Sequence, residues 1–116
     1  MSTSNHQHPH LSNKILSDIE RIIEDQLVDN WVVRIEYTKK IEYMVTSWQQ
    51  WGETFFNITD ASGVIKNIIS CHKNNPQCAM RLHAEKYSPR SYLYFWLCQA
   101  KCISKDIKAK SFKIVN

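Results

Sequence analysis

Glycine and proline are scarce in this sequence, which has only two glycines and three prolines among 116 residues. Their scarcity excludes a collagen-like chain and a flexible linker. Long apolar runs are absent too, so we predict no membrane-spanning helix, and residues 1–10 lack the apolar segment of a secretory signal peptide. The composition that remains, 43% hydrophobic and 22% charged, is typical of one small globular domain.

The positive charge of the chain is concentrated near its C-terminus. The net charge is +4, and residues 101–113 hold five lysines against one acid, Asp106. A basic segment of this kind binds an acidic protein surface, nucleic acid or no partner at all. Because basic and acidic residues balance in the rest of the chain, we predict no nucleic-acid partner.

The spacing of apolar residues predicts two helices. The first spans about 13–28 and is capped by Ser12. The second is capped by Thr59 or Asp60 and ends at residues 74–76, Asn-Asn-Pro. The apolar stripes of the two helices consist of Ile15, Leu16, Ile19, Ile22, Ile23 and Leu27, and of Ala61, Val64, Ile65, Ile68, Ile69 and Cys71.

Alternating apolar and polar residues predict four strands. These are Trp31–Tyr37, Ser47–Trp51, Cys78–Ala84 and Tyr92–Gln99. We expect Gly52 to end the second strand, and residues 107–115 have a weaker pattern that would add an edge strand. The order of elements predicts an α+β domain whose two helices cover one face of a four-stranded sheet. We expect this domain to span 12–100, with a flexible arm at 1–11 before it and a basic tail at 101–116 after it.

The last predicted strand carries more apolar surface than two helices can cover. Residues 92–98 are apolar on both faces, and Phe55, Phe56 and two tryptophans lie in the neighbouring segments. An exposed aromatic face on so small a domain is typical of a binding surface. The sequence therefore predicts a partner protein.

Residue patterns that would carry chemistry are incomplete in this chain. The cysteines at 71, 78, 98 and 102 form no Cys-x-x-Cys pair, and two of them lie in apolar segments, so we expect buried thiols and no metal. His83-Ala-Glu85 is the first half of a zinc deaminase signature whose Pro-Cys-x-x-Cys half is missing. Cys71 and His72 lie near a helix C-terminus, where a thiolate is disfavoured. The residues alone favour a binding module over an enzyme.

The middle of the sequence resembles the small subunit of ribulose bisphosphate carboxylase (RuBisCO). The resemblance is carried by Trp31–Thr38 (WVVRIEYT), Trp48–Gly52 (WQQWG), Asp60–Val64 (DASGV), Cys71–Pro76 (CHKNNP) and Arg81-Leu82. These motifs follow one another at the family's spacing without a gap from Trp31 to Glu85, and their details are most similar to the red-type branch. The resemblance covers about residues 19–99 and is specific as a combination.

This resemblance implies a fold, an assembly and a role. It implies an antiparallel four-stranded sheet with two helices on one face. It also implies that eight small subunits cap a core of eight large ones and surround a central channel. Catalysis, magnesium and the carbamylated lysine would then belong to the large subunit, so this chain would stabilise and tune the core without cofactor or catalytic residues of its own. A bacterial cytoplasm and a plastid stroma are equally compatible.

The resemblance also assigns roles to individual residues. Glu36 would bind a basic group on the large subunit, and Arg81 matches a strand arginine of the family. Trp48, Trp51 and Phe56 match the aromatic segment that packs on the large subunit. The alternatives are a solvated strand carboxylate for Glu36, an intramolecular ion pair for Arg81, and packing within the chain's own core for the three aromatic residues. The loop that would face the channel includes Lys39, Lys40, Glu42 and Tyr43.

The sequence departs from the family at its ends and leaves two further functions open. The family's N-terminal Tyr-Leu-Pro-Pro-type arm is absent, and a short lysine-rich tail replaces the red-type C-terminal hairpin. The chain could therefore be an adaptor that binds RuBisCO or another acidic protein without being a stoichiometric subunit. The remaining alternative is an unrelated metal-binding or nucleic-acid-binding module.

Overall fold

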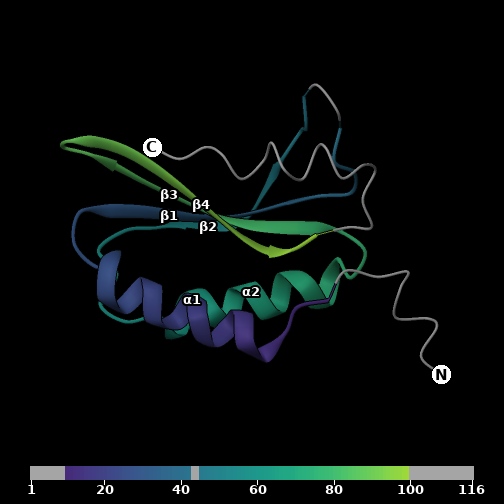
Figure 1. The fold of residues 1–116 in the computed structure, drawn as a ribbon, viewed down its shortest axis with the longest axis horizontal. Coiled ribbons are helices and arrows are strands. Elements are labelled where there is room, and N and C mark those ends of the chain that lie inside the picture. The colour runs from purple at the N-terminus through teal and green to yellow at the C-terminus, as the bar shows by residue number, and fades with distance from the viewer. Residues whose placement is uncertain (1–9, 43–44, 100–116) are drawn as a thin grey trace.

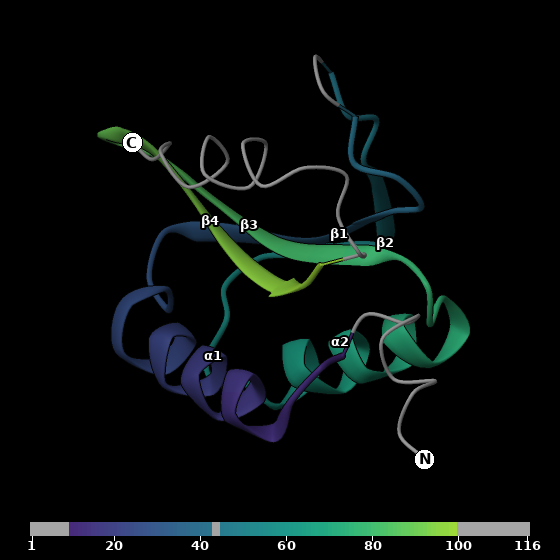
Figure 2. The same cartoon turned by 45° about the vertical axis from the view of Figure 1, so that its right-hand side comes forward.

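The computed structural model describes residues 10–42 and 45–99 as two helices on one face of an antiparallel sheet (Figure 1). The elements are α1 (Asn13–Gln26), β1 (Trp31–Thr38), β2 (Gln49–Phe55), α2 (Ser62–Asn74), β3 (Ala79–Tyr87) and β4 (Arg90–Cys98). The strand order is β2-β1-β3-β4, so β2 and β4 are the edge strands. Figure 2 shows both helices below the sheet from a second direction. The predicted α+β fold is confirmed.

Three predictions concern segments outside the described residues. These are most of the N-terminal arm, the basic tail at 101–116 and the edge strand at 107–115. Leu11, which the sequence assigns to the arm, is partly buried against the core. The domain boundaries therefore remain a prediction.

Helix α1 begins and packs as its sequence indicates. The hydroxyl of Ser12 accepts a hydrogen bond from the backbone N–H of Ile15 at 3.1 Å, which satisfies one of the free donors at the helix start. Ile19 and Ile23 are buried on the sheet side of the helix. Leu27, which follows the last helical residue, is fully buried and anchors the end of the helix in the core.

Helix α2 is fixed at its start by two carboxylates. The Asp60 carboxylate accepts from the backbone N–H of Ser62 at 2.9 Å and from its hydroxyl at 2.7 Å. Glu24 of α1 accepts from the N–H of Ala61 at 3.1 Å and thereby ties the two helices together. Asp60, one of the two predicted capping residues, thus contributes to the start of α2, while Ala61 occupies the cap position itself.

The hydrophobic core lies between the helices and the inner face of the sheet. The central strands β1 and β3 contribute Val33, Ile35, Leu82 and Ala84, all fully buried. In the antiparallel register Val33 lies opposite Ala84 and Ile35 opposite Leu82, so these side chains point to the same face. Each fully buried aliphatic side chain of this size stabilises the fold by about 1.5–3 kcal/mol.

The second strand corrects one prediction. Gly52 does not end β2, which continues to Phe55 through an irregularity in its pairing with β1. Ile35 pairs with Trp51 but Val33 pairs with Phe55, so β2 has two more residues than β1 over this interval. Gly52 lies there at φ +70°, a left-handed conformation that glycine adopts readily. A bulge in the strand explains why the glycine does not terminate it.

Candidate partner interface on the outer face of the sheet

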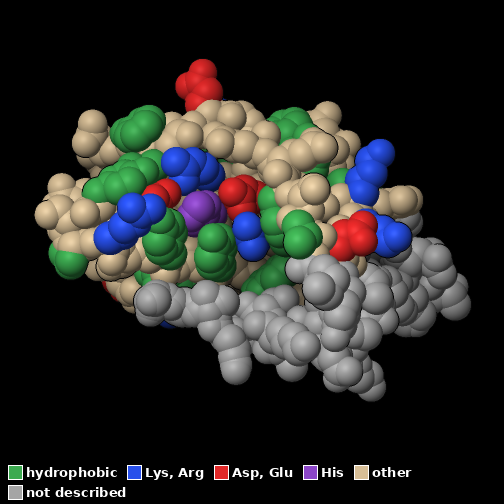
Figure 3. Space-filling model, turned by 90° about the horizontal axis from the view of Figure 1, so that it is seen from above, with side chains coloured by type: hydrophobic (Ala, Val, Ile, Leu, Met, Phe, Trp, Pro, Cys, Tyr) green, Lys and Arg blue, Asp and Glu red, His purple; other side chains and the backbone are tan. Residues whose placement is uncertain are grey.

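The face of the sheet turned away from the helices, here called the outer face, carries charged and aromatic side chains. Figure 3 shows this face with a histidine surrounded by acidic and basic groups and by hydrophobic side chains. The strands place it there because alternate residues of β1, β3 and β4 point outward. The residues are Arg34 and Glu36 from β1, Arg81, His83 and Glu85 from β3, and Tyr92, Tyr94 and Trp96 from β4.

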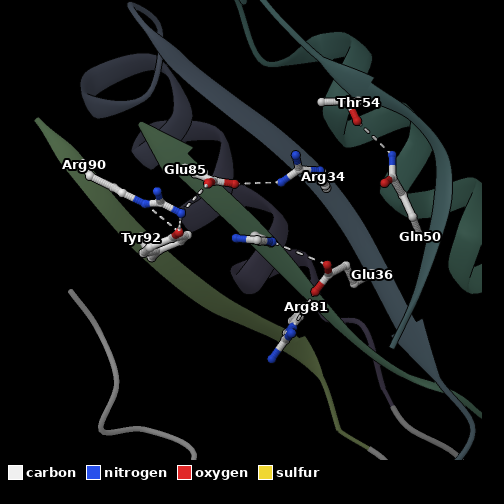
Figure 4. A network of polar contacts seen from close by, with 9 residues as sticks. Arg34, Glu36, Gln50, Thr54, Arg81, Glu85, Arg90 and Tyr92 are labelled. Carbon is white, nitrogen blue, oxygen red and sulfur yellow. Dashed lines mark hydrogen bonds and ion pairs between the residues drawn. The ribbon is translucent and has the colours of Figure 1, made fainter. Parts of the chain in front are cut away.

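Glu36 is engaged within the chain by two neighbours on β3. The Nε atom of Arg81 donates to Glu36 Oε1 at 2.7 Å, and Nδ1 of His83 lies 3.4 Å from Oε2 (Figure 4). Burial raises the pKa of Glu36, but the hydrogen bonds from His83 and Arg81 outweigh burial, and the net effect is a lowered pKa. Glu36 is therefore ionised and already paired on both oxygens at neutral pH.

Glu85 forms the second paired carboxylate of the outer face. It is only 7% exposed. Arg34 Nη1 lies 3.1 Å from its Oε1, and Arg90 Nη2 lies 3.9 Å from its Oε2. Each of these two carboxylates therefore has two basic neighbours. The antiparallel register sets Arg34 diagonally across from Glu85, and it sets Glu36 diagonally across from His83.

A continuous row of stacked planar groups crosses the outer face. The guanidinium of Arg81 lies 4.2 Å from the ring centroids of both Trp48 and Tyr94. The row continues from Tyr94 to His83, whose ring centroid is 4.7 Å away at 26°, and from His83 to Tyr92 at 6.1 Å and 27°. We call Trp48, Arg81, Tyr94, His83 and Tyr92 the stacked row. Such contacts between cations and rings are each worth about 0.5–2 kcal/mol, depending on solvation.

His83 is largely enclosed by its neighbours in the stacked row. Its side chain is 12% exposed, and its Nε2 atom is buried without a hydrogen-bond partner among the described residues. Two tyrosine rings and the Glu36 carboxylate fix its orientation. His83 therefore has a fixed place between Tyr94 and Tyr92 in the row.

The loop between β1 and β2 rests on the outer face at one end of the row. Trp48 packs edge-on against Trp96 at 5.7 Å, together with the buried residues Ile41 and Ala79. The base of this loop borders a cavity of about 200 Å³ whose lining includes Thr38, Lys39, Lys40 and Glu42. The predicted loop residues Lys39, Lys40 and Glu42 are exposed, and Tyr43 lies outside the described residues.

The five interface residues predicted from the sequence do not share one surface. Glu36, Arg81 and Trp48 meet on the outer face. Trp51 lies on the inner face, partly buried against the core and edge-on to Tyr37 at 6.1 Å. Phe56 follows the end of β2 and is 64% exposed. Their contacts with a partner remain a prediction.

Sequence reasoning missed several outer-face residues that the structure brings together. His83 enters the sequence analysis only as part of an incomplete deaminase signature, and Tyr92 and Tyr94 only as members of a strand whose aromatic surface would bind a partner. Alternation on β3 and β4 places all three on one face with Arg81, but their stacking depends on which residues of the two strands lie opposite each other. The sequence alone does not give that register.

The three cysteines that the structure describes, Cys71, Cys78 and Cys98, are buried core residues. Cys71 is fully buried, and burial raises its pKa to about 12; burial likewise raises the pKa of Cys98 to about 11. Cys98 Sγ lies 4.0 Å from His72 Nδ1, and burial lowers the pKa of His72. A thiol with so high a pKa is a poor nucleophile at neutral pH, which agrees with the prediction of structural thiols.

Two further findings concern metal ions and membranes. Across residues 10–42 and 45–99, no three His, Cys, Asp or Glu side chains are grouped so that they could hold a metal ion. Neither of the helices described here is long and apolar enough to cross a membrane.

Comparison with known proteins gives consistent matches. The family model for "Ribulose bisphosphate carboxylase, small chain" matches residues 2–96. The RuBisCO small subunit of Sinorhizobium medicae is 36% identical over 62 residues, which cover 53% of this chain and 48% of that protein. The small subunit of Xanthobacter flavus is 31% identical over 68 residues, 59% of this chain and 51% of its own length. The matched stretch thus spans about half the length of these relatives.

A red-algal small subunit and a solved structure match as well. The small subunit of Porphyridium aerugineum is 26% identical over 68 residues, covering 59% of this chain and 49% of that protein. A chain of the structure titled "RuBisCO from Galdieria partita" superposes with a TM-score of 0.66 at 22% identity, over 74% of this chain and 64% of the other. At that identity the superposition supports the fold.

Proposed function

This chain belongs to the ribulose bisphosphate carboxylase small chain family, and we propose that it serves as a small subunit of that enzyme. In this role it binds the large subunit and stabilises and tunes the core that fixes carbon dioxide. It is not catalytic by itself. Magnesium and the carbamylated lysine belong to the large subunit, and the assembly works in a bacterial cytoplasm or a plastid stroma.

The stacked row is the observation that supports this proposal beyond the family match. Tyr92, Tyr94, Trp96 and Trp48 lie on the face opposite the helices and are only half-buried. Rigid aromatic groups alternating with arginine are enriched at the centres of protein interfaces. The outer face therefore has the chemistry of a preformed docking surface.

The loop between β1 and β2 has a separate role in the proposed assembly. Lys39, Lys40 and Glu42 are exposed at its base, next to the cavity. We assign this loop to the central channel, where it would meet solvent and neighbouring small subunits. The packing of Trp48 against Trp96 would hold the loop at a fixed angle to the sheet.

Co-expression with the cognate large subunit tests the proposal. We expect one particle that contains both chains and has carboxylase activity, measured by size exclusion with light scattering and by carbon dioxide incorporation. A small species eluting beside an intact large-subunit core would refute the subunit role and favour an adaptor. The comparisons with known proteins do not favour the adaptor, since the relatives described above are small subunits.

Phe56 provides a test of the interface that leaves the core intact. Its side chain is 64% exposed, so Phe56→Ala should change the free energy of unfolding by only about 0.5 kcal/mol or less. An interface anchor, in contrast, loses about 2 kcal/mol or more of binding free energy when truncated to alanine. Ile69→Ala, which removes another exposed apolar side chain from α2, is the matched control. Equal binding by both variants would exclude Phe56 as an anchor.

A further inference from the structure

The two carboxylates of the outer face are each already engaged by two basic groups of this chain. Both oxygens of Glu36 are engaged, by Arg81 at 2.7 Å and by His83 at 3.4 Å. Glu85 lies between Arg34 and Arg90 and is 7% exposed. A lysine or arginine from another protein would meet the positive charge of these neighbours. A partner surface that presents a lysine or arginine is therefore poorly matched to the outer face.

Arg81, in contrast, presents unused donors. Its Nε is bonded to Glu36, and both faces of its guanidinium are covered by Trp48 and Tyr94 at 4.2 Å. Its terminal nitrogens have no acceptor among the residues that the structure describes, and 20% of the side chain is exposed. The stack keeps the guanidinium planar and oriented, so the free edge is prepared for an acceptor in the same plane.

The charge balance of the surrounding surface favours an anion as that acceptor. The outer face and its rim hold the guanidiniums of Arg34, Arg81 and Arg90 against two carboxylates that are already paired. On the adjoining loop Lys39 and Lys40 are exposed beside one acid, Glu42, so the loop adds to the positive charge. A planar guanidinium edge matches the two oxygens of a carboxylate, which accept both of its N–H groups at once.

We propose that the partner surface places an aspartate or glutamate carboxylate against the free edge of Arg81, and that Glu36 orients Arg81 from within the chain. This inference rests on the proposed function, because the partner is the large subunit. It reverses the sign of the contact that the family resemblance implies for Glu36. Arg81 is then the recognition residue, and Glu36 is a positioning residue.

Binding of full-length variants to the large subunit tests this assignment. Arg81→Gln should weaken association roughly 30-fold or more, the lower end of the loss seen when one partner of a paired charge is removed at an interface. Glu36→Gln should weaken it by less than about fivefold, because the glutamine carbonyl still accepts from Arg81 Nε. Arg21→Gln on the opposite layer, which also removes one exposed positive charge, is the control and should leave association unchanged.

The order of these effects decides between the two contacts. If Glu36→Gln weakens association more than Arg81→Gln does, a basic partner group binds Glu36 and the inference is wrong, although the subunit role stands. Equal and small effects would place Arg81 outside the interface and would also overturn it. A wild-type chain that fails to associate would refute the proposed function itself.

A second variant keeps the test valid if Arg81→Gln proves unstable. Arg81→Lys retains the positive charge but loses the planar fork and its stacking. It should still weaken association about tenfold or more if two in-plane hydrogen bonds are lost. Unchanged binding by a folded Arg81→Lys chain would overturn the carboxylate assignment. Thermal melting of each variant, monitored by circular dichroism, establishes which chains are folded at the assay temperature.

Discussion

The two glycines of the chain should respond in opposite directions to the same substitution. Gly52 lies in the bulge of β2 at φ +70°, where a Cβ atom would come 3.8 Å from Asn67 Oδ1. Gly63 lies in the first turn of α2, where a Cβ would meet no atom within 4 Å. Replacing either with alanine adds one methyl group without a clash. Only the backbone conformation distinguishes the two sites.

The magnitudes follow from that difference. The left-handed conformation at Gly52 costs an alanine about 1–2 kcal/mol. Alanine also restricts the unfolded chain, which favours folding by about 0.4–1 kcal/mol at a compatible site. At Gly52 the backbone cost dominates, and Gly52→Ala should destabilise the protein by about 1 kcal/mol. At Gly63 only the entropic gain remains, and Gly63→Ala should stabilise by about 0.4–1 kcal/mol.

Urea denaturation of the two variants and the wild type measures these effects. We expect the midpoints to move to opposite sides of the wild-type value with unchanged slopes. Gly52→Asn is a further control, because asparagine tolerates the left-handed region better than alanine and should lose less stability. If Gly52→Ala is neutral or stabilising, then the positive φ at the bulge is not required and the account of why β2 continues past Gly52 is wrong.

Two further predictions concern titration and thiol reactivity. The pKa of Glu36 is held below its ordinary value of 4.5, so the stability that its ionised form contributes is present above pH 4.5 and is lost as the pH falls through the lowered native pKa. Glu36→Gln removes this titration and should flatten the acid side of the stability profile. Urea midpoints measured across that pH range test this prediction. Cys71 and Cys98 have pKa values of about 12 and about 11, so both thiols should resist alkylation by iodoacetamide at neutral pH. Peptide mass mapping measures the modification, and finding either residue modified in the native protein would contradict their burial.

Local periodicity was sufficient to predict the elements of the fold. The stripes of α1 and α2 and the alternation of β1, β3 and β4 each depend on residues a few positions apart, and the structure has them where the sequence indicates. The continuation of β2 past Gly52 was missed because a bulge depends on the pairing of two strands. A single glycine is typical both of a turn and of a strand bulge, so the sequence around Gly52 does not distinguish the two.

The candidate site was predictable only in part. Glu36 and Arg81 were singled out through the family resemblance, but they are 45 positions apart, and their pairing follows from the register between β1 and β3. His83 drew no functional prediction because the deaminase signature that begins with it lacks its cysteine half. Trp51 resembled Trp48 in sequence, yet it lies opposite the buried Ile35 and therefore points toward the core. The sequence identifies each side chain but does not show which side chains of neighbouring strands lie opposite one another.

The cross-strand ion pairs of the outer face also bear on how the sheet finds its alignment during folding. If β1 slipped by one residue against β3, Arg34 and Glu36 would turn toward the helices, and Val33 and Ile35 would turn to solvent. The misaligned chain would bury two charges without partners, a cost of several kcal/mol. Arg34 and Glu36, which pair across the strands in the native register, therefore penalise incorrect strand pairing before any partner is present.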